Sequence, residues 1–66
     1  MVRTTVSLAS TALLSASYDD DTQVLDVTFT NGRTYTHEGV PLEVFEGLRD
    51  APSPGGYYGS AIKGRY

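Results

Sequence analysis

The amino-acid sequence predicts a small α+β domain, a three-stranded antiparallel β-meander packed against two short C-terminal helices. Three observations lead to this fold class. Apolar and polar side chains alternate over much of residues 13–37, the period of a strand with one buried face. The dipeptide Asn31-Gly32 is typical of a hairpin turn. A short amphipathic segment begins just after Pro41. With 66 residues, the chain is expected to form a single domain over 1–66.

The meander is expected to have strands at Leu13–Tyr18, Gln23–Thr30 and Arg33–His37. Residues 19–22, three aspartates and a threonine, predict the first turn, because Asp side chains bond to their own backbone in turns. Asn31-Gly32 predicts a type I′ turn, which needs a positive φ at both central residues. These turns are short enough to make all three strands antiparallel neighbours.

The N-terminal residues continue the alternation. One parity includes Val6, Leu8, Ser10, Ala12, Leu14, Ala16 and Tyr18. The small residues 10–12 predict a bend, so residues 1–9 are either a less regular extension or a further strand. Ser7, Ser10 and Thr11 interrupt the apolar run, which argues against a secretion signal. No run is long enough to span a membrane. We expect a cytoplasmic protein.

The helices are predicted at Leu42–Asp50 and, after the cap-like Ser53-Pro54, over residues 55–66. The first helix places an apolar stripe on one side and charged residues on the other. Three glycines weaken the second helix. The expected core consists of Leu25, Val27, Phe29, Val44, Leu48 and Ile62.

The sequence offers no arrangement for catalysis or metal binding. It contains no Cys and a single His, His37, which excludes disulfides and Cys-ligated zinc. The neighbours Arg33, Thr34 and Thr36 provide no group that would orient an imidazole for acid–base chemistry. Residues 19–21 could form a metal loop, but a run of aspartates is more often a solvated turn. We therefore expect neither an enzyme nor a bound metal or cofactor.

Aromatic and basic residues form the candidate binding surface. Five residues are tyrosines, three of them in the last ten positions, beside Lys63 and Arg65. Tyrosine can stack on a nucleobase while Lys or Arg contacts phosphate. The candidate ligand-binding residues are Tyr57, Lys63, Arg65, Tyr66, Arg33 and Tyr35. Tyr18, Tyr35 and Tyr58 have an alternative role in the core, since a thin core favours large rings with a polar tip.

Three stretches of the chain resemble the KTSC domain, a short module found at the C-terminus of some lysyl-tRNA synthetases and as free-standing bacterial and phage proteins. They are the segment ending in Tyr18-Asp19, the block from Gly32 to Pro41, and the tail from Ala51 to Tyr66. The sequence departs from the family pattern at His37, which replaces a tyrosine, at Gly59, which replaces an asparagine, and at Lys63, which replaces an arginine. The resemblance implies RNA binding as a function.

Two functions from different classes are consistent with these features. The first is a non-catalytic module that binds RNA or a nucleotide through the aromatic and basic face; the net charge of −3 argues against indiscriminate nucleic-acid binding. The second is a phage-type protein-interaction factor, an inhibitor or a self-assembling subunit that could sequester a nucleotide signal. The acidic residues of 38–50 favour a basic protein partner, and the small size favours a homo-oligomer.

Overall fold

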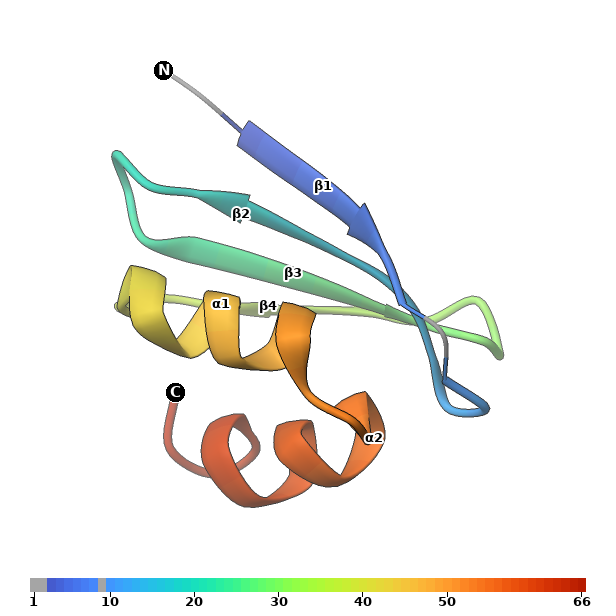
Figure 1. The fold of residues 1–66 in the computed structure, drawn as a ribbon. Helices are drawn as coiled ribbons and strands as arrows, with labels where there is room; N and C mark the ends of the chain where they lie inside the picture. Colours follow the sequence, from blue (N-terminus) through green and yellow to red (C-terminus); the bar gives the residue numbers. More distant parts are fainter. Residues whose placement is uncertain (1–2, 9) are drawn as a thin grey trace.

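The computed structural model describes residues 3–8 and 10–66, which form a four-stranded antiparallel sheet with a helical layer on one face (Figure 1). In order across the sheet, the strands are β1 (Arg3–Ser7), β2 (Leu13–Asp19), β3 (Val24–Phe29) and β4 (Thr34–His37). The helical segments are α1 (Leu42–Asp50), α2 (Pro54–Tyr57) and the π-helical turn η1 (Tyr58–Ile62). Among these described residues, no helix has the length and apolar character needed to cross a bilayer.

The expectation of three strands is wrong, because the N-terminal segment adds β1 at the edge of the sheet. It pairs with β2 in a register that runs from Arg3 opposite Asp19 to Ser7 opposite Ser15. Most of its side chains are exposed, so burial leaves only a weak periodic signal in the sequence. Of the alternatives for residues 1–9, the structure shows the strand; residues 1, 2 and 9 lie outside the described residues.

A β-bulge in β2 reverses the predicted orientation of two leucines. Leu13 pairs with Phe29 and Ser15 with Thr28, so Leu14 is an extra residue in β2. Leu13 is fully buried and Leu14 is 56% exposed. The sequence pattern had placed Leu14 on the face that carries Ala16. One inserted residue shifts the phase of a strand by half a period, which accounts for the difference.

The hairpin between β3 and β4 is present but is not a type I′ turn. The N–H of Gly32 donates to the Phe29 carbonyl at 2.9 Å, and the N–H of Phe29 donates to the Arg33 carbonyl at 2.7 Å. Gly32 has a φ of 90°, whereas Asn31 does not have a positive φ. These bonds define a three-residue loop in which Gly32 takes the left-handed position. The positive φ at both positions, expected from Asn-Gly, is therefore wrong.

The core lies between the sheet and the helices. Its buried members are Leu8, Leu13, Ala16, Tyr18, Leu25, Val27, Val40, Phe45, Leu48, Tyr58 and Ile62. Four of the six predicted core residues are among them, and the other two, Phe29 and Val44, pack against them half-buried. The Tyr18 ring stacks on Phe45 with centroids 5.0 Å apart, and its hydroxyl donates to the Val40 carbonyl at 2.5 Å. This bond fixes the chain where it enters α1.

The C-terminal helical segment differs in kind from the expected helix. The bounds of α1 are as predicted, but the second segment begins as the short α-turn α2 and widens into η1. In η1 the N–H of Lys63 donates to the Tyr58 carbonyl at 2.8 Å, a separation of five residues. Turns of this kind are rare and are found frequently at functional sites.

Candidate functional site

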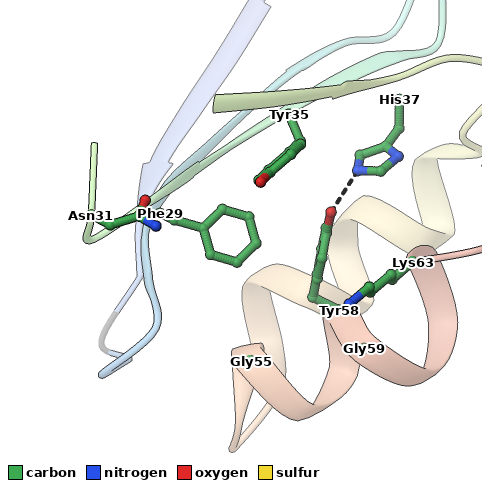
Figure 2. Close-up of a pocket in the computed structure, with 8 residues that line it drawn as sticks. All are labelled: Phe29, Asn31, Tyr35, His37, Gly55, Tyr58, Gly59 and Lys63. Atoms are coloured by element: carbon green, nitrogen blue, oxygen red, sulfur yellow. Dashed lines mark hydrogen bonds between the residues drawn. The ribbon is translucent and has the colours of Figure 1, made fainter. Parts of the chain in front are cut away.

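A pocket of about 580 Å³ lies between the β3–β4 edge of the sheet and the C-terminal helical segment. Figure 2 shows aromatic side chains from the sheet facing the helical segment across this space. The lining residues are Phe29, Asn31, Tyr35, His37, Gly55, Tyr58, Gly59 and Lys63. The volume lies within the range of about 300–1,000 Å³ that is usual for small-molecule sites.

Three aromatic rings form one wall of the pocket. Phe29 meets both Tyr35 and Tyr58 edge to face, with ring centroids 5.2 Å apart in each pair. Tyr58 is buried, as its alternative role in the core required, whereas Tyr35 is 44% exposed and is not a core residue. Tyr35 lies on the edge strand β4, where no further strand covers it. The exposed part of its ring faces solvent beside the Phe29 ring.

His37 joins the pocket wall to the end of the helical segment. Its Nδ1 lies 3.2 Å from the Tyr66 carbonyl oxygen and its Nε2 lies 2.9 Å from the Tyr58 hydroxyl. A carbonyl oxygen can only accept, so Nδ1 carries the hydrogen, and Nε2 of the neutral ring is then an acceptor. With the ring neutral, the Tyr58 hydroxyl donates its hydrogen to His37.

The Tyr58 hydroxyl keeps the proton that this arrangement requires. Burial raises the pKa of Tyr58 above its ordinary value, and the nearby Tyr35 hydroxyl adds to the shift. The phenol is thus neutral at physiological pH and remains a donor to His37.

The π-turn accounts for the position of Lys63 in the pocket. In an α-helix, residues five apart point about 140° away from each other, because each residue rotates by about 100°. The bond from the Lys63 N–H to the Tyr58 carbonyl widens the turn and brings the two residues closer to the same side. Lys63 is exposed, and its ammonium has no hydrogen bond or ion pair with any of residues 3–8 and 10–66. It is a cation available to an anionic ligand.

The structure brings only two of the six predicted site residues, Tyr35 and Lys63, into the lining of this pocket. Tyr66 contributes its backbone carbonyl to His37, and its side chain is 42% exposed. Tyr57 is half-buried against α1, and Arg33 and Arg65 are exposed outside the lining.

Sequence reasoning missed six lining residues, which are Phe29, Asn31, His37, Gly55, Tyr58 and Gly59. Phe29 had been assigned to the core and Tyr58 had core packing as its alternative role, which their apolar neighbours made reasonable. The single imidazole of His37 was a usable signal, because an imidazole can both donate and accept hydrogen bonds.

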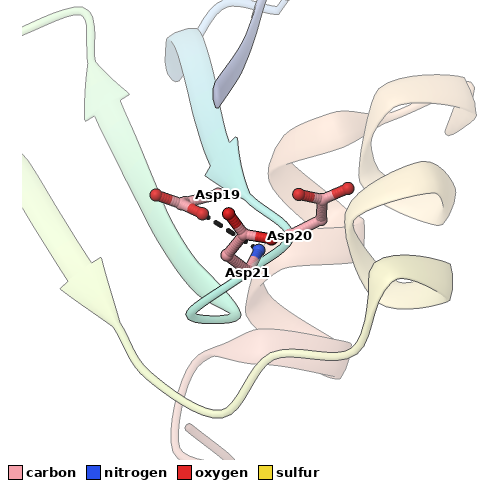
Figure 3. A group of neighbouring side chains, drawn as sticks. All are labelled: Asp19, Asp20 and Asp21. Atoms are coloured by element: carbon pink, nitrogen blue, oxygen red, sulfur yellow. Dashed lines mark hydrogen bonds between the residues drawn. The ribbon is translucent and has the colours of Figure 1, made fainter. Parts of the chain in front are cut away.

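The three aspartates lie where β2 ends, with Asp19 as the last residue of the strand and the other two in the turn that follows (Figure 3). The Oδ1 atom of Asp19 accepts the N–H of Asp21 at 3.0 Å and of Thr22 at 3.4 Å. One carboxylate of the trio is thus bonded to the turn backbone, and Asp19 is buried while its two neighbours are exposed. This geometry agrees with the turn predicted from the sequence.

The outer face of the sheet carries polar side chains, many of which form hydrogen bonds with one another. Arg3 donates to Asp26 at 2.8 Å and to Ser17 at 2.9 Å, and Thr36 donates to Asp26 at 2.7 Å. The Thr36 hydroxyl and the Arg3 guanidinium lower the pKa of Asp26, against the opposing effect of partial burial. These bonds link all four strands across the face that the helices leave open.

The fold and the pocket together define a small α+β module with a ligand-sized aromatic cavity. A sequence profile of the KTSC domain matches residues 9–66. The chain therefore belongs to the KTSC domain family, as its sequence motifs indicated.

Known proteins similar to the chain fall into free-standing and appended forms. An uncharacterized protein of Stutzerimonas stutzeri is 40% identical over 58 residues, covering 88% of this chain and 82% of that protein. A lysine–tRNA ligase of Trichormus variabilis is 43% identical over 49 residues, 74% of this chain but only 9% of the ligase. The crystal structure of a KTSC domain protein from Yersinia pestis superimposes with a TM-score of 0.90 at 30% identity, covering 97% of this chain and 90% of that one.

Proposed function

We propose that this domain is a non-catalytic module that binds a nucleotide, either free or as an unpaired residue of RNA, in the aromatic pocket. The observation that carries the proposal is the placement of Tyr35, Tyr58 and the unpaired ammonium of Lys63 around one cavity. The base of a nucleotide provides a ring that can stack on Tyr35, and its phosphate provides a negative charge for Lys63. Exposed aromatic rings contribute about 1–3 kcal/mol per stacked base.

The charge distribution supports a short ligand in place of a long duplex. The chain has a net charge of −3, whereas binding along duplex DNA requires neutralising several phosphates. Lys63 at the pocket supplies a single local cation, which suits one phosphate. The match to lysine–tRNA ligases, enzymes named for their action on tRNA, supports RNA as one source of the nucleotide.

Gly59 provides a variant that tests this function without disturbing the core. A Cβ at Gly59 would contact nothing within 4 Å, and Gly59 lines the pocket. A Gly59→Trp side chain should fill the cavity and weaken binding by about 5- to 150-fold, the equivalent of one stacked base. Gly59→Ala is the control, because a single methyl group occupies little of the cavity and should leave binding nearly unchanged.

The titrations use mononucleotides in one arm and short single-stranded RNA in the other, monitored by isothermal calorimetry. If the protein binds both mononucleotides and RNA, and Gly59→Trp weakens both, the result supports the pocket as the binding site. If the protein binds RNA alone, the ligand is a polymer. If the wild-type protein binds neither at micromolar concentrations, the proposal fails. The rival function, recognition of a protein partner, would then be favoured. Unaltered binding by Gly59→Trp would place the site elsewhere on the surface.

A further inference from the structure

We infer that the pocket selects adenine and cytosine, which carry an exocyclic amino group where hypoxanthine and uracil carry a carbonyl, because His37 makes the Tyr58 oxygen a hydrogen-bond acceptor. The inference rests on the proposed function and extends it to a ligand class, adenine and cytosine nucleotides. It depends on the hydrogen-bond chain from Tyr58 through His37 to Tyr66.

The direction of this chain follows from its far end. The Tyr66 carbonyl accepts from Nδ1 of His37, so Nε2 of the neutral ring accepts from the Tyr58 hydroxyl. The hydroxyl hydrogen is thereby turned toward His37 and away from any ligand. What Tyr58 retains for a ligand is an oxygen lone pair, which requires a donor on the ligand edge.

The Tyr58 oxygen is an acceptor, whereas Lys63 and Asn31, which also border the pocket, offer donors. Lys63 presents an ammonium, which can only donate. The Asn31 Oδ1 accepts the N–H of Arg33 at 3.0 Å, so the amide of Asn31 has its NH₂ group left to offer. The Tyr35 hydroxyl can act in either sense. A ring with an amino group satisfies the Tyr58 acceptor, whereas a ring with a carbonyl in its place sets two acceptors against each other.

His37 is thus a positioning residue that acts through Tyr58. The selectivity it creates is that of one neutral hydrogen bond, so amino-bearing nucleotides should bind about 3- to 10-fold more tightly than their keto counterparts. The pairs to compare are adenosine and inosine 5′-monophosphates, and cytidine and uridine 5′-monophosphates. The two members of each pair carry the same phosphate, so contacts to Lys63 cancel in the ratio.

The test measures these four dissociation constants at pH 8. Tyr58→Phe keeps the ring and removes the acceptor, so the ratio should fall to about one. His37→Phe releases the Tyr58 hydrogen, which can then donate to the ligand, and the ratio should fall to one or reverse. A structural role for His37 would weaken all four nucleotides equally and leave the ratio unchanged. Tyr66→Phe is the control: it removes a tyrosine hydroxyl outside the pocket lining, keeps the backbone carbonyl that His37 contacts, and should preserve the wild-type ratio.

The outcomes separate this inference from the function on which it rests. No binding of any nucleotide overturns the proposed function. Binding of all four with equal affinity, or with a preference for inosine and uridine, overturns the inference while the function stands. Retention of the wild-type ratio in Tyr58→Phe would also overturn it. Circular dichroism and thermal unfolding verify that each variant is folded before its ratio is used.

Discussion

Tyr57 covers Gly47, and the ring of the first occupies the space that a side chain on the second would need. A Cβ built on Gly47 would lie 2.7 Å from Cζ of Tyr57, well inside contact distance. The pair joins α1 to α2, and it makes Tyr57 a packing residue where sequence had suggested a stacking surface. The glycine in the middle of a helix thus has a steric reason.

The Gly47–Tyr57 contact predicts a change of sign in a double-mutant cycle. Gly47→Ala should destabilise the wild-type protein by about 1–3 kcal/mol, because the methyl group displaces the Tyr57 ring. In a Tyr57→Ala background the same substitution should stabilise by about 0.5–1 kcal/mol, the usual helix preference for Ala over Gly. Urea unfolding of the four proteins measures both steps. Equal effects in the two backgrounds would show that the residues do not touch.

The bulge in β2 predicts opposite sensitivities at adjacent leucines. Leu13→Ala should cost about 2–5 kcal/mol, because Leu13 is fully buried. Leu14→Ala should change the free energy of unfolding by less than about 0.5 kcal/mol, because Leu14 is largely exposed. Thermal and urea unfolding provide the comparison. A regular strand without the bulge would reverse the order of the two effects.

Two residues at positive φ predict substitutions of opposite sign. Gly32 has a φ of 90°, so Gly32→Val should cost more than about 1 kcal/mol. Gln23 has a φ of 59° without being glycine, so Gln23→Gly should stabilise by a few tenths of a kcal/mol after the added chain entropy is deducted. The midpoints of urea unfolding report both. Destabilisation by Gln23→Gly would mean that its side chain contributes more than its backbone costs.

Asp26 predicts a stability change in acid. Its pKa is lower in the folded protein than the ordinary value of 3.8, chiefly through the Thr36 hydroxyl. A lowered pKa stabilises the folded state above pH 3.8, and the contribution disappears as pH falls below this value through the folded-state pKa. Thr36→Val should therefore flatten the decline of melting temperature between about pH 5 and pH 2. An unchanged slope would assign the acid sensitivity to other carboxylates.

The two C-terminal cations predict different effects on nucleotide binding. Lys63 lines the pocket and has no partner among residues 3–8 and 10–66, whereas Arg65 donates to the Ser60 carbonyl at 3.3 Å and lies outside the lining. Lys63→Glu should weaken binding of single-stranded RNA and reduce the log–log salt slope by about 0.7, the value for one phosphate contact. Arg65→Glu is the matched control and should change the slope little. Titrations at several salt concentrations distinguish them; equal effects would indicate a diffuse basic surface.

The parts of the fold that were predictable are those governed by local pattern. Period-two alternation located β2, β3 and β4 to within a residue or two, and the apolar stripe located α1, because both reflect which face is buried. The alternation of the N-terminal residues left β1 open between a strand and a less regular extension, because most of its side chains are exposed. The insertion of Leu14 is invisible until its pairing with β3 is known.

The site was less predictable because it is assembled across the chain. Tyr35 and Lys63 were proposed from their chemistry alone, and the structure places both in the pocket lining. The role of His37 depends on Tyr58, 21 residues further along the chain, and on Tyr66, 29 residues further along. Lys63 reaches the pocket through the five-residue turn, for which no sequence signal is apparent.

The pocket lies between two layers of the fold, so a bound ligand would affect the stability of the domain. Phe29 and Tyr35 belong to the sheet, while Gly59 and Lys63 belong to the helical segment. A chain of 66 residues without cysteine has no disulfide bond to hold these layers together. A ligand bound between the two layers would contact both of them. The stability of the folded domain would then rise with the concentration of that ligand.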